Sequence, residues 1–222
     1  MIAIKRSRLA VVTASLSATL ALSACGLAND DIAHSESSTA MYQAYNDAMT
    51  KMHSEMMLGM GYNDPDSAFT QGMLGHHLGA VDMAKIQLKY GKDPEMLQLA
   101  QKIIDAQEVE IEQMQKWLNS HPDVAAPMAD TGAMQQAYAT GMNDMHGEMT
   151  LGITDPNPDM AFARGMLPHH RGAVDMAEVQ LEYGKDPEML QLAQEIIAAQ
   201  QPEIEQMQNW IKANGGVESN AQ

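Results

Sequence analysis

The chain contains two copies of one long segment, and this internal repeat limits the folds that it can adopt. Residues 69–117 match residues 162–210 at a constant offset of 93 positions, so that Phe69 corresponds to Phe162 and Trp117 to Trp210. The match continues upstream, where 52–56 corresponds to 145–149. Because a repeated sequence favours a repeated structural unit, each element of the first copy is expected again in the second.

Both copies have the residue spacing of helices and lack the alternation of apolar and polar residues that is typical of strands. Gly91, Asp93 and Pro94 supply a helix end, an N-cap and a first helical residue, and Gly184, Asp186 and Pro187 repeat them. The expected helices span 41–58, 65–90 and 94–118 in the first copy and 134–151, 157–183 and 187–212 in the second.

Four of these helices are long, two in each copy, and they predict an all-α fold. We expect a four-helix bundle with pseudo-twofold symmetry, built from the two tandem repeats, with the two shorter helices packed across or alongside it. Two independent three-helix domains are the alternative. Each would have only about 80 residues and a modest core, so the joint bundle is favoured.

The first 24 residues have the composition of a signal peptide. Lys5, Arg6 and Arg8 precede a short apolar stretch that ends near Leu22. Residues 22–25 read Leu-Ser-Ala-Cys, which resembles a bacterial lipobox with Cys25 as the lipidated residue. The alternative is an ordinary secretory signal with an incidental cysteine. In both cases we expect export, and in the first a periplasmic or surface lipoprotein of the cell envelope that contacts the membrane only through its lipid anchor.

Composition divides the rest of the chain. The expected parts are a flexible tether at 25–40, helical repeat 1 at 41–118, a linker at 119–133, helical repeat 2 at 134–213 and a disordered tail at 214–222. The formal net charge is −16, and without the three basic residues of the signal segment ten Lys and Arg would face 29 Asp and Glu. This balance argues against nucleic acid or an anionic lipid surface as a partner. It is compatible with attraction of cations and equally with simple solubility.

Methionine and histidine recur at matching positions of the two copies. The paired His are 53/146, 76/169 and 77/170, and the paired Met are 41/134, 49/142, 52/145, 56/149, 73/166, 83/176, 96/189 and 114/207. The chain has 21 Met but only 2 Phe and 2 Trp. Thioethers and imidazoles suit Cu(I) and, by the same softness, Ag(I). With Cys25 lipidated, no thiolate would remain to take part.

Helical spacing groups these side chains on two faces of each copy. On the first expected helix one face presents thioether, imidazole and thioether, and on the second a Met stands three and four residues before a pair of His. The predicted metal ligands are Met52, His53, Met56, Met73, His76, His77, Met83, Met145, His146, Met149, Met166, His169, His170 and Met176. The alternative for a Met stripe is core packing. The recurrence of His inside the stripes favours metal.

Two further features bear on these faces. Gln107 and Gln200 interrupt the apolar stripe of the third helix, and a buried amide needs partners, so each either supports a metal ligand or ties helices together. The residue before the His pair is Gly75 in one copy and Pro168 in the other. Both residue types weaken a helix, and a kink there would aim the His pair inward.

Other chemistries fit poorly. The Glu-x-x-His pairs of di-iron bundles, the His-Glu-x-x-His of zinc proteases, a Gly-rich phosphate loop and a Ser nucleophile elbow are all missing from the sequence. No catalytic residue is therefore predicted.

The run Gly-Met-Leu-Pro-His-His-Arg-Gly-Ala-Val-Asp-Met-Ala at 165–177, followed by Tyr-Gly-Lys-Asp-Pro-Glu at 183–188, resembles the bacterial family named domain of unknown function 305. The resemblance covers about 41–212, in two tandem copies. It implies a ferritin-like helical fold, export and, from some members, copper binding and copper resistance. The family motif falls on Met73, His76, His77 and Met83, and on Met166, His169, His170 and Met176. Gly75 departs from the usual Pro.

Three functions remain open at this point. The favoured hypothesis is a lipid-anchored protein that sequesters Cu(I), or Ag(I), through Met and His and exchanges it with a copper donor or acceptor protein, without turnover. Cu(II) could bind through His at a separate site. The second hypothesis is a copper-dependent redox enzyme of the cuprous oxidase type. The third is a helical envelope interaction protein without metal.

Overall fold

The computed structural model describes residues 25–121 and 126–218, and the described part of the chain is helical throughout, without strands. The helices are α1 (Cys25–Gly59), α2 (Pro65–Tyr90), α3 (Pro94–Ser120), α4 (Thr131–Gly152), α5 (Pro158–Tyr183) and α6 (Pro187–Ala213). The predicted all-α class is confirmed. None of the described helices has the length and apolar composition needed to span a bilayer. The predicted signal segment 1–24 lies outside the described residues.

The helices begin at the capping signals that the sequence carries. Asp93 and Asp186 precede α3 and α6, and each accepts hydrogen bonds from two backbone N–H groups of the first turn. Asn157 caps α5 in the same way, and Asp64 caps α2 by accepting one hydrogen bond, from the backbone N–H of Ser67. Each of these four helices has Pro at its first position, where a missing N–H costs nothing.

Helix α1 begins earlier than expected. Residues 25–40 were predicted to be a flexible tether, and a helix occupies them. The segment holds no Pro and only one Gly, at Gly26, so its composition does not oppose a helix. The chain divides into two units at this helix, Met1–Ser35 and Glu36–Gln222, and the second unit contains both repeats. The remaining domain boundaries stay predictions.

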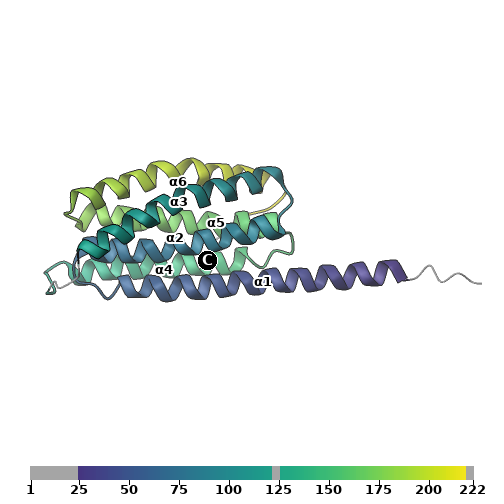
Figure 1. Ribbon diagram of the computed structural model, residues 1–222, viewed down its shortest axis with the longest axis horizontal. Coiled ribbons are helices and arrows are strands. Elements are labelled where there is room, and N and C mark those ends of the chain that lie inside the picture. Colours follow the sequence, from purple (N-terminus) through teal and green to yellow (C-terminus); the bar gives the residue numbers. More distant parts are fainter. Residues whose placement is uncertain (1–24, 122–125, 219–222) are drawn as a thin grey trace, which may run out of the picture. The chain divides into compact units, whose positions relative to one another are not determined.

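Within the second unit the helices form three layers (Figure 1). The central layer is α2 packed against α5. On one side α3 covers α2 and α6 covers α5, and on the other α4 packs on α5. The imidazole rings of His53 and His146 lie 5.4 Å apart and bring α1 beside α4. Each layer therefore contains the same helix from both repeats.

Two buried aspartates fasten the repeats to each other in a reciprocal way. Asp66 at the start of α2 accepts a hydrogen bond of 2.6 Å from Gln180 Nε2 and one of 3.0 Å from the backbone N–H of Lys185. Asp159 at the start of α5 accepts a bond of 2.6 Å from Gln87 Nε2. It also accepts the backbone N–H groups of Lys92 and Asp93. These contacts join the repeats into one folded unit, so two independent three-helix domains do not describe this chain.

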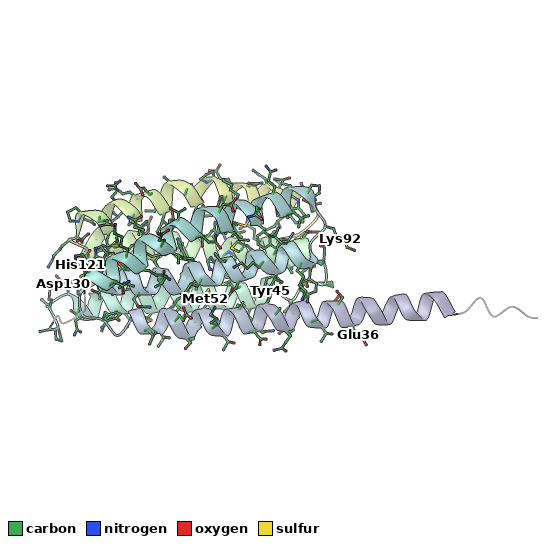
Figure 2. The ribbon with its side chains drawn as sticks, in the orientation of Figure 1. Glu36, Tyr45, Met52, Lys92, His121 and Asp130 are labelled. Carbon is green, nitrogen blue, oxygen red and sulfur yellow. The ribbon has the colours of Figure 1, made fainter. Side chains whose placement is uncertain are left out.

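The core of this unit is rich in thioethers. Both members of all eight Met pairs are buried. Tyr45 and Met52 on α1 are buried to the same degree, at 0% and 2% exposure (Figure 2). Burial of this kind is expected both of core-filling methionines and of metal ligands. Burial alone therefore does not distinguish core packing from metal binding, and the arrangement around the histidines is the feature that can.

Candidate metal centre

Four histidines lie at the centre of the bundle. His76 and His77 of α2 and His169 and His170 of α5 are all 0% exposed. The rings of His76 and His169 are 3.7 Å apart between centroids, which places them at the contact of the two central helices. The rings of each consecutive pair are 6.1 Å apart. Because imidazole is polar, four of them in a core need partners for their nitrogens.

The outer histidine of each pair contacts a glutamate of the flanking helix. Nε2 of His77 lies 2.6 Å from Glu110 Oε2 on α3, and Nε2 of His170 lies 2.8 Å from Glu203 Oε2 on α6. A carboxylate that accepts the Nε2–H proton leaves the lone pair on Nδ1 of the same ring. Histidine ligands of metals are commonly held in this manner by a carboxylate or a carbonyl group.

The ring nitrogens that remain have no partner among the described residues. Nδ1 of His77, His169 and His170 is buried and makes no hydrogen bond, and neither nitrogen of His76 makes one. Nε2 of His169 lies 3.1 Å from the carbonyl oxygen of His76, to which it donates. Each imidazole thus keeps at least one buried nitrogen without a hydrogen-bond partner among the described residues, and such a nitrogen is available to bind a metal ion. The described residues contain no group of three or more His, Cys, Asp and Glu side chains arranged to hold a metal ion, so any such site would also need thioether ligands.

The central histidines are held in the form that binds metals. Burial lowers the pKa of His76 and of His169 well below the ordinary value, and the neighbouring imidazoles lower it further. Both rings are therefore neutral at physiological pH. A neutral imidazole offers its lone pair without first losing a proton.

The two repeats differ at the glutamates. Glu203 is also 3.1 Å from Lys102 Nζ, whereas the position that corresponds to Lys102 in the second repeat is Glu195. Burial by itself would raise the pKa of Glu203, but the hydrogen bond and charge of His170 and the ion pair with Lys102 together lower it. The glutamate beside His170 therefore also has a lysine as an ion-pair partner. The second repeat does not supply a lysine at the position that corresponds to Lys102.

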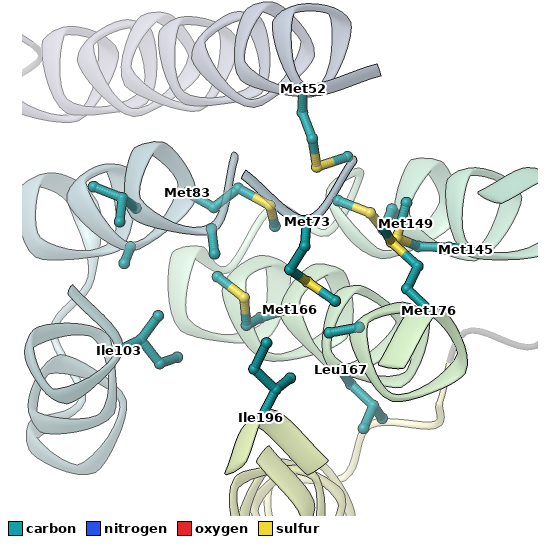
Figure 3. Packing of buried hydrophobic residues seen from close by; sticks show 14 of the residues in the cluster. Met52, Met73, Met83, Ile103, Met145, Met149, Met166, Leu167, Met176 and Ile196 are labelled. Atoms are coloured by element: carbon teal, nitrogen blue, oxygen red, sulfur yellow. The ribbon is translucent and has the colours of Figure 1, made fainter. Parts of the chain in front are cut away.

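Methionines from both repeats meet in the core between the helices (Figure 3). A Cβ atom on Gly79, one turn after His76, would be 2.5 Å from Met52 Sδ, so the absence of a side chain at Gly79 allows this thioether to pack on α2. Gly172 receives Met145 in the same way, with its Cβ position 2.6 Å from Sδ.

Two further methionines cross between the repeats. The methyl group of Met83 on α2 packs against Gly165 of α5, and that of Met176 on α5 packs against Gly72 of α2. Met73, Met149 and Met166 are 0% exposed and belong to the same core cluster. The predicted Met ligands are thus in the core, and the particular ones that would join each histidine pair stay a prediction.

His53 and His146 lie apart from the buried cluster. They face each other across the seam of α1 and α4, where His53 is half-buried and His146 is exposed. Met56, predicted to share a face with His53, points instead into a small cavity together with Met60, Met142 and Met176. The single predicted face of the first helix is therefore split between the seam and the core.

The glycine before the histidine pair of the first repeat has a different explanation from the predicted kink. Both α2 and α5 remain helical through Gly75 and Pro168. A Cβ atom on Gly75 would lie 2.9 Å from the backbone of Glu55 and Met56, so Gly is needed there to let α1 approach α2 closely. Pro168 is buried within α5.

Gln107 and Gln200 are both buried at 3% exposure, as their place on the stripe predicted. Neither Oε1 has a hydrogen-bond partner among the described residues, and the same holds for Nε2 of Gln200. No described hydrogen bond joins either amide to a histidine, so their supporting role stays a prediction. The glutamates that do contact histidines were missed. Their signal was present, because Glu110 and Glu203 are paired across the repeats and stand three residues after the two glutamines.

The free energy of unfolding is expected to fall as the pH drops below about 6.5, the ordinary pKa of histidine. Unfolded His76 and His169 would bind protons that the buried rings do not, so stability rises with pH up to that value and levels off above it. Each imidazole contributes a slope of up to about 1.4 kcal/mol per pH unit. Urea unfolding in the presence of a metal chelator measures the slope, and a His76→Gln/His169→Gln variant with an equally steep slope would contradict this assignment.

The fold and the buried donors define a class of protein, namely an all-helical bundle with paired imidazoles and thioethers in its core. A family model described as domain of unknown function 305 matches residues 66–211. The chain belongs to this family.

Several solved structures are similar to this chain. CopM in its Cu(I)-bound form is 34% identical with a TM-score of 0.52, and the match covers 68% of this chain and 98% of CopM. CopM has also been solved in Ag-bound and Cu(II)-bound forms. A protein of the same family from Streptomyces coelicolor has a TM-score of 0.56 at 24% identity, covers 72% of this chain and 99% of its own, and shows the fold alone.

One curated protein also matches over a short segment. Uncharacterized protein L153 of Acanthamoeba polyphaga mimivirus is 43% identical over 49 residues. The match spans 22% of this chain and about a third, 32%, of the viral protein.

Proposed function

We propose that this protein binds Cu(I), or Ag(I), in the core of its helical bundle and thereby sequesters the ion or hands it on in the cell envelope. The observation that carries the proposal is the set of buried imidazole nitrogens without a protein donor at His76, His77, His169 and His170. Thioethers packed beside these helices supply soft ligands of the kind that Cu(I) prefers. The 34% identity to CopM, which has been solved with Cu(I), Ag and Cu(II), supports the same reading.

In this proposal the histidines and the methionines supply different ligand atoms to the same ion. The imidazoles of His77 and His170, held by Glu110 and Glu203, present Nδ1 to the ion, and thioethers such as those of Met52 and Met145 complete its coordination. Neither ligand type needs to lose a proton, and neither couples into disulfides in an oxidising compartment. The acidic surface, with 29 Asp and Glu against 13 Lys and Arg, favours the approach of cations.

The experiment that tests the function is an anaerobic titration of the purified protein with Cu(I) against a chromophoric Cu(I) chelator. The proposal expects the protein to withdraw at least one ion per chain from the chelator. A protein that fails to compete even with a weak chelator would leave the helical interaction hypothesis in its place. Oxygen uptake in the presence of Cu(I) distinguishes a storage protein from a cuprous oxidase. For a storage protein we expect a rate of oxygen uptake no higher than that of free Cu(I).

The glutamate contacts give a graded prediction. Glu203→Gln keeps the size of the side chain but removes the carboxylate that orients His170, so Cu(I) affinity is expected to fall by roughly 10–100-fold. Glu110→Gln is expected to act in the same direction through His77. Exposed Glu112 and Glu205 stand two residues further along the same helices, and their Gln variants serve as matched controls. Equal affinity of Glu203→Gln and Glu205→Gln in the chelator competition would contradict the orienting role.

The membrane attachment rests on Cys25 alone. If the predicted lipobox is used, Cys25→Ser is expected to abolish labelling by a radioactive fatty acid and to release the protein from the membrane fraction. Copper binding by the released protein is expected to be unchanged, because the buried ligands belong to the unit Glu36–Gln222. Membrane-bound, labelled Cys25→Ser protein would refute the lipid anchor and leave the copper site untouched.

A further inference from the structure

A cavity lined by thioethers lies where α1, α2, α4 and α5 meet. Met56 of α1, Met60 just beyond its end, Met142 of α4 and Met176 of α5 all line it. No histidine is among the described residues of its wall. The cavity has a volume of about 10 Å³, which is room for about one water-sized sphere.

We propose that Met56, Met60, Met142 and Met176 form a thioether-only site for one soft monovalent cation, Ag(I) or Cu(I), distinct from the histidine cluster. The inference extends the proposed function, since it gives the same protein a second class of site. Four neutral sulfur ligands select a soft ion and offer nothing to Mg²⁺ or Ca²⁺, which take oxygen ligands. The other wall residues include Ala68 and Gly72, which leave the methionines as the main donors.

A cation in an apolar cavity needs a nearby negative charge to offset the loss of water. Tyr138 lines the cavity, and its buried hydroxyl has no hydrogen-bond partner among the described residues. Burial raises the pKa of Tyr138, and the carboxylate of Asp66 raises it further, so the field of this carboxylate reaches the wall of the cavity. The carboxylate of Asp66 is therefore one source of negative potential at this wall.

The internal repeat supplies a natural comparison. The corresponding positions in the other half of the bundle are Met49, Met83 and Met149 for three of the sulfurs, but Ile153 stands where the fourth, Met60, would be. By sequence correspondence, the equivalent positions of the other half supply three thioethers where this wall has four. Only the wall with four thioethers is expected to hold a soft ion tightly, so its three-thioether counterpart should contribute no bound equivalent.

The test uses the full chain, with ¹³C-methyl methionine, titrated with silver nitrate in chloride-free buffer. Met60→Ile, which installs the residue of the other repeat, is expected to lose one equivalent of bound Ag(I) per chain. It is also expected to lose the Ag(I)-induced shifts of the Met56, Met142 and Met176 methyl signals. Met60→Leu, which keeps the volume of the side chain, is expected to do the same while remaining folded. Ile153→Met is expected to gain an equivalent.

The outcomes separate this inference from the proposed function. Met60→Ile and Met60→Leu that both keep the full stoichiometry would overturn the thioether-only site and leave the histidine cluster standing. A wild-type chain that binds no Ag(I) would overturn both. In a variant with all four core histidines changed to Gln, one remaining equivalent that Met60→Leu then removes supports the inference directly.

Discussion

The variant in which His76, His77, His169 and His170 are all changed to Gln is expected to lose tight Cu(I) binding. The cost should exceed about 100-fold in affinity, because removing even an outer hydrogen-bond partner of a metal ligand costs roughly 10–100-fold. Glutamine is polar and of similar size, so it can occupy the core without opening a large cavity. Chelator competition under anaerobic conditions measures the loss, and far-UV circular dichroism checks that the helices remain.

His121→Gln is the matched control for this variant. His121 stacks on Trp117 at 4.2 Å, is exposed, and lies outside the buried cluster, so its loss should leave Cu(I) affinity unchanged. A quadruple variant that is folded and binds as tightly as the His121→Gln protein would show that the core histidines only pack the bundle.

Asp159→Ala is expected to reduce the free energy of unfolding by about 3 kcal/mol. The change leaves the side-chain amide of Gln87 and the backbone N–H groups of Lys92 and Asp93 without their acceptor in the interior, and each such group costs about 1–3 kcal/mol. The melting temperature should fall by roughly 6–12 °C, from about 2–4 °C for each kcal/mol in a domain of this size. Asp66→Ala should behave alike, since Asp66 holds Gln180 and Lys185.

Asp82→Ala provides the control for the buried aspartates. Asp82 pairs with Lys51 at 3.0 Å on the surface, with side chains 35% and 54% exposed, and such pairs contribute at most about 1 kcal/mol. Thermal unfolding of the three variants measures the difference. Equal shifts for Asp82→Ala and Asp159→Ala would mean that the reciprocal contacts do not hold the repeats together.

The sequence predicted the helices well because their ends are encoded locally. Pro65, Pro94, Pro158 and Pro187 open helices behind residues that cap them, and each lies within one residue of an expected start. The N-terminal extension of α1 was not predicted, because the segment 25–40 lacks an apolar stripe and periodicity therefore gave no sign of a helix there.

The site was predicted in part, because helical spacing places residues on a face but does not tell how deeply that face is buried. It placed His76 and His169 on the Met-bearing face of the second helix of each repeat, and both are fully buried. It grouped His53 with Met52 and Met56, yet about 100° of helical rotation separates consecutive residues and is enough to put His53 at the seam and Met52 in the core.

The contacts between helices could not be predicted from the amino-acid sequence alone. Glu203 is a charged residue of a type that is usually exposed, and only the packing of α6 on α5 brings it to His170. The same holds for Asp66 and Asp159, whose partners are more than sixty positions away in the chain. Such pairs depend on how the repeats dock, which the repeat itself does not specify.

The most direct test of the central claim is an anomalous difference map from crystals of the protein loaded anaerobically with Cu(I). Anomalous peaks are expected in the bundle core within bonding distance of imidazole nitrogens of His76, His77, His169 or His170, each also bonded to at least one methionine sulfur. Peaks confined to the surface, or a fully loaded crystal without any peak at these imidazoles, would contradict it.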